Sequence, residues 1–168
     1  MGRLQRILKH RWLDERDARR AVDAPALQRI EARVAASERH HSGEIRVCIE
    51  AGLPMSYLLR DATARERAVA RFGKLRVWDT EHNNGVLIYL LLAERNIEIV
   101  ADRGLNVHVS PAQWQAVSAA MSEAFRNQRF EAGLNQAIEA VDALLVRHFA
   151  LAAGESNPNE LPDRPLVL

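Results

Sequence analysis

The stretch from Asn83 to Gly104 constrains the fold of this chain more than any other. Val86 to Leu92 is an unbroken apolar run that follows turn residues at Asn83-Asn84-Gly85, and Ile97 to Ala101 alternates apolar with polar residues. A short polar connection, Ala93 to Asn96, separates the two runs. We therefore predict a β-hairpin whose first strand is buried on both faces.

A strand and a helix are predicted before this hairpin. Residues Glu44 to Glu50 alternate apolar with polar, and an apolar arc recurs at helical spacing from about Ser56 to Phe72. A strand–helix–strand unit makes its two strands parallel through a right-handed crossover, whereas the short connection in the hairpin makes the third strand antiparallel to the second. The run from Val86 to Leu92 is therefore expected to be central, with the two alternating strands nearer the edges.

The rest of the chain is predicted to be mainly helical. A helix over about 23–38 begins with an aspartate and a proline in capping and first-turn positions. A second helix over about 110–126 begins with a capping box, and a third covers about 130–149. Leu105 to Val109 alternates and is a candidate for a short edge strand.

Together these elements predict an α/β fold, a three-layer α/β/α sandwich with a small mixed β-sheet of three to four strands and helices on both faces. The chain has 168 residues, which is enough for one core. We expect the domain to cover residues 23–150, with a tail at 151–168 that contains prolines and is extended or disordered. Within this tail, Pro165 to Leu168 is a candidate for docking on an apolar surface.

The N-terminal segment, 1–22, is predicted to be a basic amphipathic helix. Within residues 1–20, seven arginines and lysines stand against three acidic residues. Leu4, Ile7, Leu8 and Trp12 recur along one side at helical spacing. The simplest interpretation is that this apolar stripe packs on the domain. The alternative is that residues 1–20 bind a protein partner or a membrane surface.

Composition excludes several classes of function. The formal net charge is +1, and the three tryptophans are scattered, so we expect no nucleic-acid partner. Cys48 is the only cysteine, which excludes an internal disulfide, and its place in a predicted strand indicates a buried structural thiol. The sequence shows no signal-peptide pattern, and its longest apolar run, Val86 to Ala93, is too short for a transmembrane segment. We therefore expect a cytoplasmic protein.

Strand direction predicts where a functional site would lie. The start of the first strand, the start of the second and the end of the third share one edge of the sheet. That edge gathers loops 39–43, 79–84 and 102–104. The candidate metal ligands in these loops are Asp79, Asp102, Asn84, His82 and His41.

Carboxylate and carbonyl oxygens favour Ca²⁺, Mg²⁺ or Mn²⁺ as the cofactor. Asp102 and Arg103 are the candidate catalytic pair, because the guanidinium fork of Arg103 suits a phosphate group. His40, His41 or His82 would be an auxiliary ligand or an acid/base. The alternative is that these are ordinary loop and helix-end residues, since the sequence contains no recognised metal-ligand spacing, phosphate-binding loop or nucleophile elbow.

An ordered set of segments resembles the TPM domain family. The set comprises Gly43 to Val47, Asn84 to Ile88, Ile97 to Leu105, Ala124 to Arg126 and Phe130 to Leu134. The resemblance covers about residues 26–149 and implies an α/β/α sandwich. It further implies a phosphatase, a calcium-binding protein or a factor that maintains membrane-associated complexes, since family members have been described as each.

The chain departs from many members of that family. They tend to have a Gly-Tyr-Gly-Leu loop where this chain has Asp102-Arg103-Gly104-Leu105, and they often have an export signal and a C-terminal membrane helix. The chain thus resembles a soluble, cytoplasmic type of member. Two hypotheses follow. The first is a divalent-metal-binding, phosphatase-like protein that uses the sheet edge, and the second is a non-catalytic interaction module that uses residues 1–20.

Overall fold

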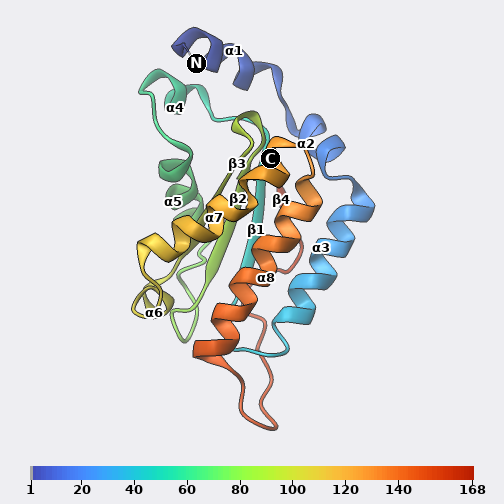
Figure 1. Cartoon of the computed structure of the whole chain (residues 1–168), viewed down its shortest axis with the longest axis vertical. Coiled ribbons are helices and arrows are strands. Elements are labelled where there is room, and N and C mark those ends of the chain that lie inside the picture. The colour runs from blue at the N-terminus through green and yellow to red at the C-terminus, as the bar shows by residue number, and fades with distance from the viewer. Residues whose placement is uncertain (1) are drawn as a thin grey trace.

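A four-stranded mixed sheet forms the centre of the molecule, in the order β3-β2-β1-β4 (Figure 1). The structure is a computed structural model that describes residues 2–168, so Met1 of the expected N-terminal helix lies outside the described residues. The strands are β1 (Ile45–Glu50), β2 (Val86–Leu91), β3 (Asn96–Ala101) and β4 (Leu166–Val167). The predicted α/β fold is confirmed.

The predicted hairpin and the predicted strand directions are confirmed. β1 runs parallel to β2, from the pair Ile45 and Val86 onward, and β2 runs antiparallel to β3. A turn of 3-10 helix, η1 (Leu92–Glu94), joins β2 to β3 and ends at Arg95 in the left-handed conformation, with φ of 50°. Every residue of β2 is buried, as the unbroken apolar run predicts.

The C-terminal tail supplies the fourth strand. β4 pairs parallel to β1, with Cys48 opposite Leu166 and Ile49 opposite Val167. The docking expected for residues 165–168 is thus confirmed in the form of strand pairing. β1 is consequently an inner strand, so the expectation that it lies near an edge is wrong, and its polar residues are buried as well as its apolar ones.

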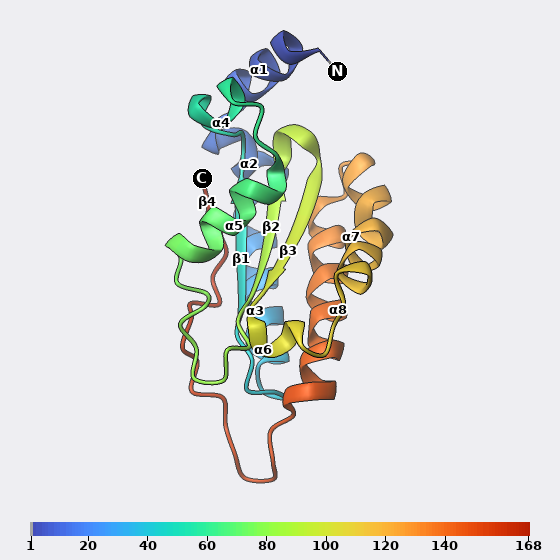
Figure 2. The ribbon, with the colours of Figure 1, turned by 90° about the vertical axis from the view of Figure 1, so that its left-hand side faces the viewer.

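Helices cover both faces of the sheet (Figure 2). On one face, α3 (Ala24–Ser37), α7 (Pro111–Arg126) and α8 (Phe130–Phe149) bury the larger part of the core, with α2 (Glu15–Ala21) at its end. On the other face, α5 (Ala64–Lys74) and the short α4 (Met55–Leu59) cover a second apolar cluster. The two clusters are separated by the sheet, which makes the three layers.

Three predicted elements differ from the structure. The helix expected over 56–72 is broken into α4 and α5, because Thr63 forms a capping box with Glu66 and starts a new helix. The single N-terminal helix is broken in the same way into α1 (Arg3–Trp12) and α2, with Asp14 as the N-cap of α2. The short edge strand expected at 105–109 is absent from the described chain, because Asp102 caps a helical turn there, α6 (Arg103–Asn106).

The apolar stripe of α1 does not pack on the domain as expected. Ile7 packs against the second cluster, but Leu4, Leu8 and Trp12 are 77%, 58% and 83% exposed. The reason is that α1 is held by its polar side chains instead, as described below. None of the helices in residues 2–168 is both long enough and apolar enough to cross a membrane.

Candidate functional site

The three loops predicted to share one edge of the sheet do lie together. Asn84 Nδ2 donates to Ser42 Oγ at 3.2 Å, which joins the loop before β1 to the loop before β2. The backbone N–H of Asp102 donates to the carbonyl of Gly85 at 2.9 Å, which joins the end of β3 to the start of β2. The convergence inferred from strand direction is therefore present in the fold.

Gly104 sets how closely two of these loops approach. Its N–H donates to the carbonyl of Asn83 at 2.9 Å. A Cβ at this position would lie 2.5 Å from that oxygen and 2.7 Å from the carbonyl oxygen of His82, so any larger residue would force the loops apart. This contact brings two backbone carbonyls beside the start of α6.

Asp102 and Arg103 lie at this contact. Asp102 Oδ1 accepts from the N–H of Arg103 at 2.7 Å as the cap of α6, while its Oδ2 is buried and has no hydrogen-bond partner among the described residues. Arg103 is exposed, and its Nε donates to Asn83 Oδ1 at 3.1 Å. The pair thus combines one buried carboxylate oxygen that has no partner in the described chain with an exposed guanidinium group on the next residue.

The other predicted ligands in the loop before β2 are either exposed at the surface or buried in the fold. Asp79 is exposed, and its carboxylate forms an ion pair with Arg76, three residues earlier. His82 is exposed in the same loop. Asn84 is fully buried, and its backbone N–H donates to Thr80 Oγ1 at 3.1 Å. Asn84 therefore stabilises its own loop with its backbone and joins that loop to Ser42 with its side chain.

His41 is turned away from the edge and into the layer between α3 and α8. Its Nδ1 lies 3.0 Å from the carbonyl of Gly43, and its Nε2 lies 2.9 Å from Ser37 Oγ, which donates to Asp142 Oδ1 at 2.6 Å. Burial lowers the pKa of His41 even though Asp142 acts to raise it. Because Ser37 and His41 are both buried, this set joins α8 to the end of α3 rather than presenting a nucleophile.

The residues of the edge do not form a carboxylate and histidine cage. Across residues 2–168, no three or more His, Cys, Asp or Glu side chains lie close enough together to hold a metal ion. A cation at this edge would have to depend on Asp102 together with backbone carbonyl oxygens and water.

The tail brings two acidic residues, Glu155 and Glu160, to this edge, and no sequence pattern predicts them there. A hollow of about 590 Å³ lies between the loop before β2 and the tail, and Glu81, His82, Glu155 and Glu160 are among its lining residues. The N–H of Glu81 donates to the carboxylate of Glu160 at 3.2 Å. No local pattern in the tail predicts this contact, because it depends on the position of β4.

A group of buried carboxyls lies at the start of β1 and was also missed. Glu38 Oε1 accepts from the N–H of Ile45 at 2.8 Å, and Glu44 Oε2 accepts from the N–H of Leu161 at 3.0 Å. Each of these two carboxyls has a second oxygen that is buried without a partner in the described chain, as has Asp163. Burial raises the pKa of Glu38 to about 9, with Glu44 and Asp163 adding to the rise, and burial raises the pKa of Glu44 as well.

Glu50, at the opposite end of β1, is buried with three partners. It accepts hydrogen bonds from Arg67 Nε at 2.9 Å, Arg71 Nη2 at 2.6 Å and the hydroxyl of Tyr89 at 2.8 Å. Burial by itself would raise the pKa of Glu50, but these hydrogen bonds outweigh it and the pKa is lowered. Burial raises the pKa of the nearby Cys48 thiol to about 12, in accord with the structural role expected for it.

This combination of features defines a class of protein. It is a three-layer α/β/α domain with a mixed sheet, in which the loops at one edge carry the polar residues. The family model of the TPM domain matches residues 16–144, and the chain belongs to the TPM domain family. Curated proteins gave no match to the chain.

Two solved structures have the same fold. The NMR structure of the BA42 protein from the psychrophilic bacterium Bizionia argentinensis is 28% identical, with a TM-score of 0.73, and the match covers 86% of this chain and 94% of that one. The N-terminal domain of a protein from P. gingivalis is 19% identical, with a TM-score of 0.62, over 78% of this chain and 83% of that one. The second likeness is one of fold alone.

Proposed function

We propose that this TPM domain protein is an accessory module that binds an anionic membrane surface through α1. The single observation that carries the proposal is that α1 is fixed to the domain by its polar side, which leaves Leu4, Leu8 and Trp12 exposed. This is the reverse of an ordinary surface helix, which buries its apolar side.

The attachment of α1 is extensive. Arg6 Nε pairs with Glu94 at 2.8 Å and its Nη1 pairs with Asp61 at 2.8 Å. His10 is buried, its Nδ1 accepts from the N–H of Leu53 at 2.9 Å, and its Nε2 lies 3.1 Å from Glu94. The exposed apolar side is therefore held in a fixed orientation and is not a frayed terminus.

The surroundings of the apolar side suit anionic lipid. Lys9, Arg11 and Arg16 are exposed, and none of the three forms an ion pair within the described residues. A basic residue close to an anionic bilayer contributes about 1 kcal/mol of attraction. An apolar cleft of about 580 Å³, lined in part by Leu8, Trp12 and Phe130, extends the same surface toward α8.

Vesicle sedimentation tests this proposal. We expect the full chain to sediment with phosphatidylcholine vesicles that contain phosphatidylglycerol, and to stay in solution with vesicles of phosphatidylcholine alone. The triple variant Leu4→Ser, Leu8→Ser, Trp12→Ser should bind at least tenfold more weakly, since burial of these side chains in lipid is lost. The matched control is Val69→Ser, Val107→Ser, Val146→Ser, three exposed valines elsewhere, and it should bind as the wild type does. Equal binding by both triple variants would refute the proposal.

A second candidate is the phosphatase-like, cation-binding role expected from the sequence. The observation that favours it is the buried Oδ2 of Asp102, which has no hydrogen-bond partner among the described residues, on the residue before the exposed Arg103. In this role Asp102 would be a ligand of Ca²⁺, Mg²⁺ or Mn²⁺, and Arg103 would bind a phosphoryl oxygen through its fork of donors.

Calorimetric titration with each of the three cations, and hydrolysis of p-nitrophenyl phosphate, test the second candidate. Asp102→Asn should abolish cation binding, and Arg103→Met should abolish hydrolysis with cation binding retained. Asp79→Asn is the matched control, because that carboxylate is already paired with Arg76. Absence of both heat and hydrolysis in the wild type would eliminate this candidate. The cytoplasmic location stays a prediction, which fractionation of cells that express the chain would test.

A further inference from the structure

β3 is the strand at one end of the sheet, and no strand among residues 2–168 lies on its outer side. In an antiparallel pair, alternate residues turn their N–H and C=O groups toward the partner strand. The N–H of Asp102 donates to the carbonyl of Gly85, which immediately precedes β2. Counting back by two residues, the backbone groups of Val100 and Glu98 therefore also face β2. Ile97, Ile99 and Ala101 therefore turn their backbone groups outward.

Side chains occupy two of these outward carbonyls. Arg65 Nη1 donates to the carbonyl of Ile99, and Asn106 Nδ2 donates to the carbonyl of Ala101 at 2.7 Å. The N–H groups of Ile97 and Ile99 and the carbonyl of Ile97 have no partner within the part of the chain that the structure describes. The outward backbone groups are thus bonded by side chains from the carbonyl of Ile99 onward and unbonded before it, and Arg65 lies where the two parts meet.

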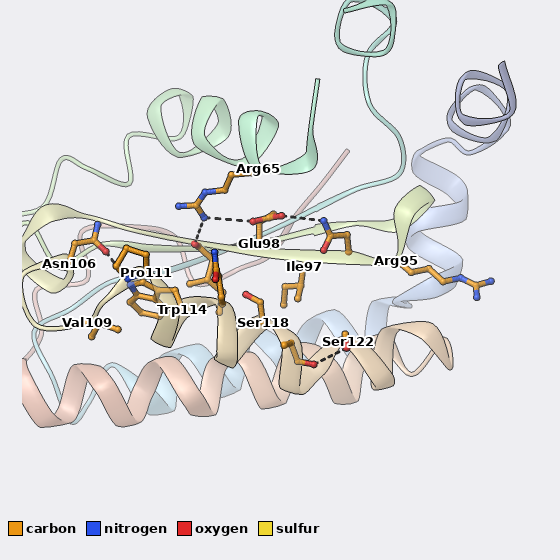
Figure 3. A pocket seen from close by; sticks show the side chains of 14 residues that line it. Arg65, Arg95, Ile97, Glu98, Asn106, Val109, Pro111, Trp114, Ser118 and Ser122 are labelled. Carbon is orange, nitrogen blue, oxygen red and sulfur yellow. Dashed lines mark hydrogen bonds and ion pairs between the residues drawn. The ribbon is translucent and has the colours of Figure 1, made fainter. Parts of the chain in front are cut away.

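A groove follows the open part of the edge (Figure 3). It has a volume of about 790 Å³ and lies between β3, α5 and α7. Arg65 and Glu98 lie on one side of β3, whereas Ser118 and Ser122 of α7 lie on the other side, with Trp114 toward one end. Ser118, Ala119 and Ser122 give part of the α7 wall small side chains, which leaves space beside the strand edge there.

The charges along the groove favour an acidic ligand. Arg65 is the basic side chain over the open edge and lies 3.7 Å from Glu98, the one acidic residue of the lining. Arg95 also lines the groove, but its side chain extends away from it, and its Nη1 donates to the carbonyl of Arg126. The side chain of Arg65 is 52% exposed and can turn from the carbonyl of Ile99 to a carboxylate on a ligand. That movement would free the carbonyl of Ile99 to accept a hydrogen bond.

We propose that this groove binds an extended acidic peptide segment of a partner protein, which pairs with Ile97 and Ile99 of β3 as a fifth strand. Backbone hydrogen bonds to the edge supply the pairing, as in other cases of strand addition. Because successive side chains of a strand point to opposite faces, alternate peptide residues face Arg65 with a carboxylate and face α7 with an apolar group. Asn106 limits the pairing by holding the carbonyl of Ala101.

Two fluorescein-labelled heptapeptides test the proposal with the full chain: one alternates valine and glutamate, and the other alternates valine and glutamine. Fluorescence anisotropy should give saturable binding of the glutamate peptide that is at least fivefold tighter than that of the glutamine peptide. In ¹⁵N-labelled protein, this peptide should shift the amide signals of Ile97 and Ile99 and slow their exchange with solvent. Arg65→Ala should remove the preference for glutamate.

A pair of tryptophan variants on α7 locates the binding. Ser118→Trp fills the groove and should weaken binding of the glutamate peptide at least tenfold. Ala120→Trp, at an exposed position of the same helix outside the groove, should leave it unchanged. Failure of the peptide to bind, shifts confined to α1, or equal loss of binding in both variants would overturn the proposal. If Ser118→Trp does not fold, the amide signals of Ile97 and Ile99 in the wild type still test the proposal, because it requires both to shift when the peptide binds.

Discussion

The two ends of β1 bury glutamates in opposite ways. At the carboxyl end, Glu50 has two arginines and a tyrosine hydroxyl around it, and its pKa is lowered. At the amino end, Glu38 has one backbone N–H and two other carboxyls near it, and its pKa is raised to about 9. Both are 4% exposed. Burial therefore does not decide the charge of these groups; their partners do.

The same substitution at the two ends should have opposite effects on stability. Glu50→Gln leaves Arg67 and Arg71 buried without a counter-charge, so it should lower the free energy of unfolding by about 3 kcal/mol. Urea denaturation at pH 8 measures this change. A loss of less than about 1 kcal/mol would mean that water reaches the two guanidinium groups. The carboxyl end of β1 would then not contain a buried ion cluster.

Glu38→Gln should raise the free energy of unfolding at pH 8 by about 2 kcal/mol. The neutral amide can still accept a hydrogen bond from the N–H of Ile45. In the wild type at pH 8, the Glu38 carboxyl is ionised in the unfolded chain and must take up a proton on folding, and the amide removes that cost. The same urea series measures the gain. Glu123→Gln, at an exposed position, is the matched control and should change the free energy by less than about 0.5 kcal/mol. A destabilised Glu38→Gln would contradict the interpretation.

The gain from Glu38→Gln should disappear in acid. A carboxyl whose pKa is raised on folding stabilises the protein below its unfolded pKa, and that contribution is lost as the pH rises toward about 9. Below about pH 4.5 the carboxyl is protonated in both states, so the variant and the wild type should differ by less than about 0.5 kcal/mol. Thermal unfolding across pH 4–9 measures the trend, and a difference that stays constant with pH would count against it.

Much of the fold could be predicted because its signals are local. The apolar run of β2, the turn before it, the capping box at Ser110 and the N-cap at Asp23 each act within a few residues, and they determine the element order. Strand direction then placed the loops that meet near Asp102. β4 could not be predicted, since it has two residues and depends on contact with Cys48 and Ile49, far earlier in the chain.

The side chains of the site were harder to predict than its position. Sequence placed His41 at the edge, but the direction of its ring depends on Ser37 and Gly43 and on the distant Asp142. Glu38 and Glu44 had no local signal for burial, because the segment that covers them is the tail. Likewise, the apolar stripe of α1 is exposed because Arg6 forms ion pairs with Asp61 and Glu94. The spacing of residues within α1 cannot predict these pairs, since both partners lie far away in the sequence.

The tail strand also has a consequence for how the protein is made. β1 cannot be completed on its outer side until residues 161–168 are available, although its other partner, β2, is present some eighty residues earlier. In the finished fold, Arg46 donates to the carbonyl of Pro162. At a synthesis rate of about 5–20 residues per second, Pro162 is added several seconds after β2, so Arg46 lacks this partner during that time. The nascent chain thus carries an open strand edge for that interval, until residues 161–168 pair with β1 and close it.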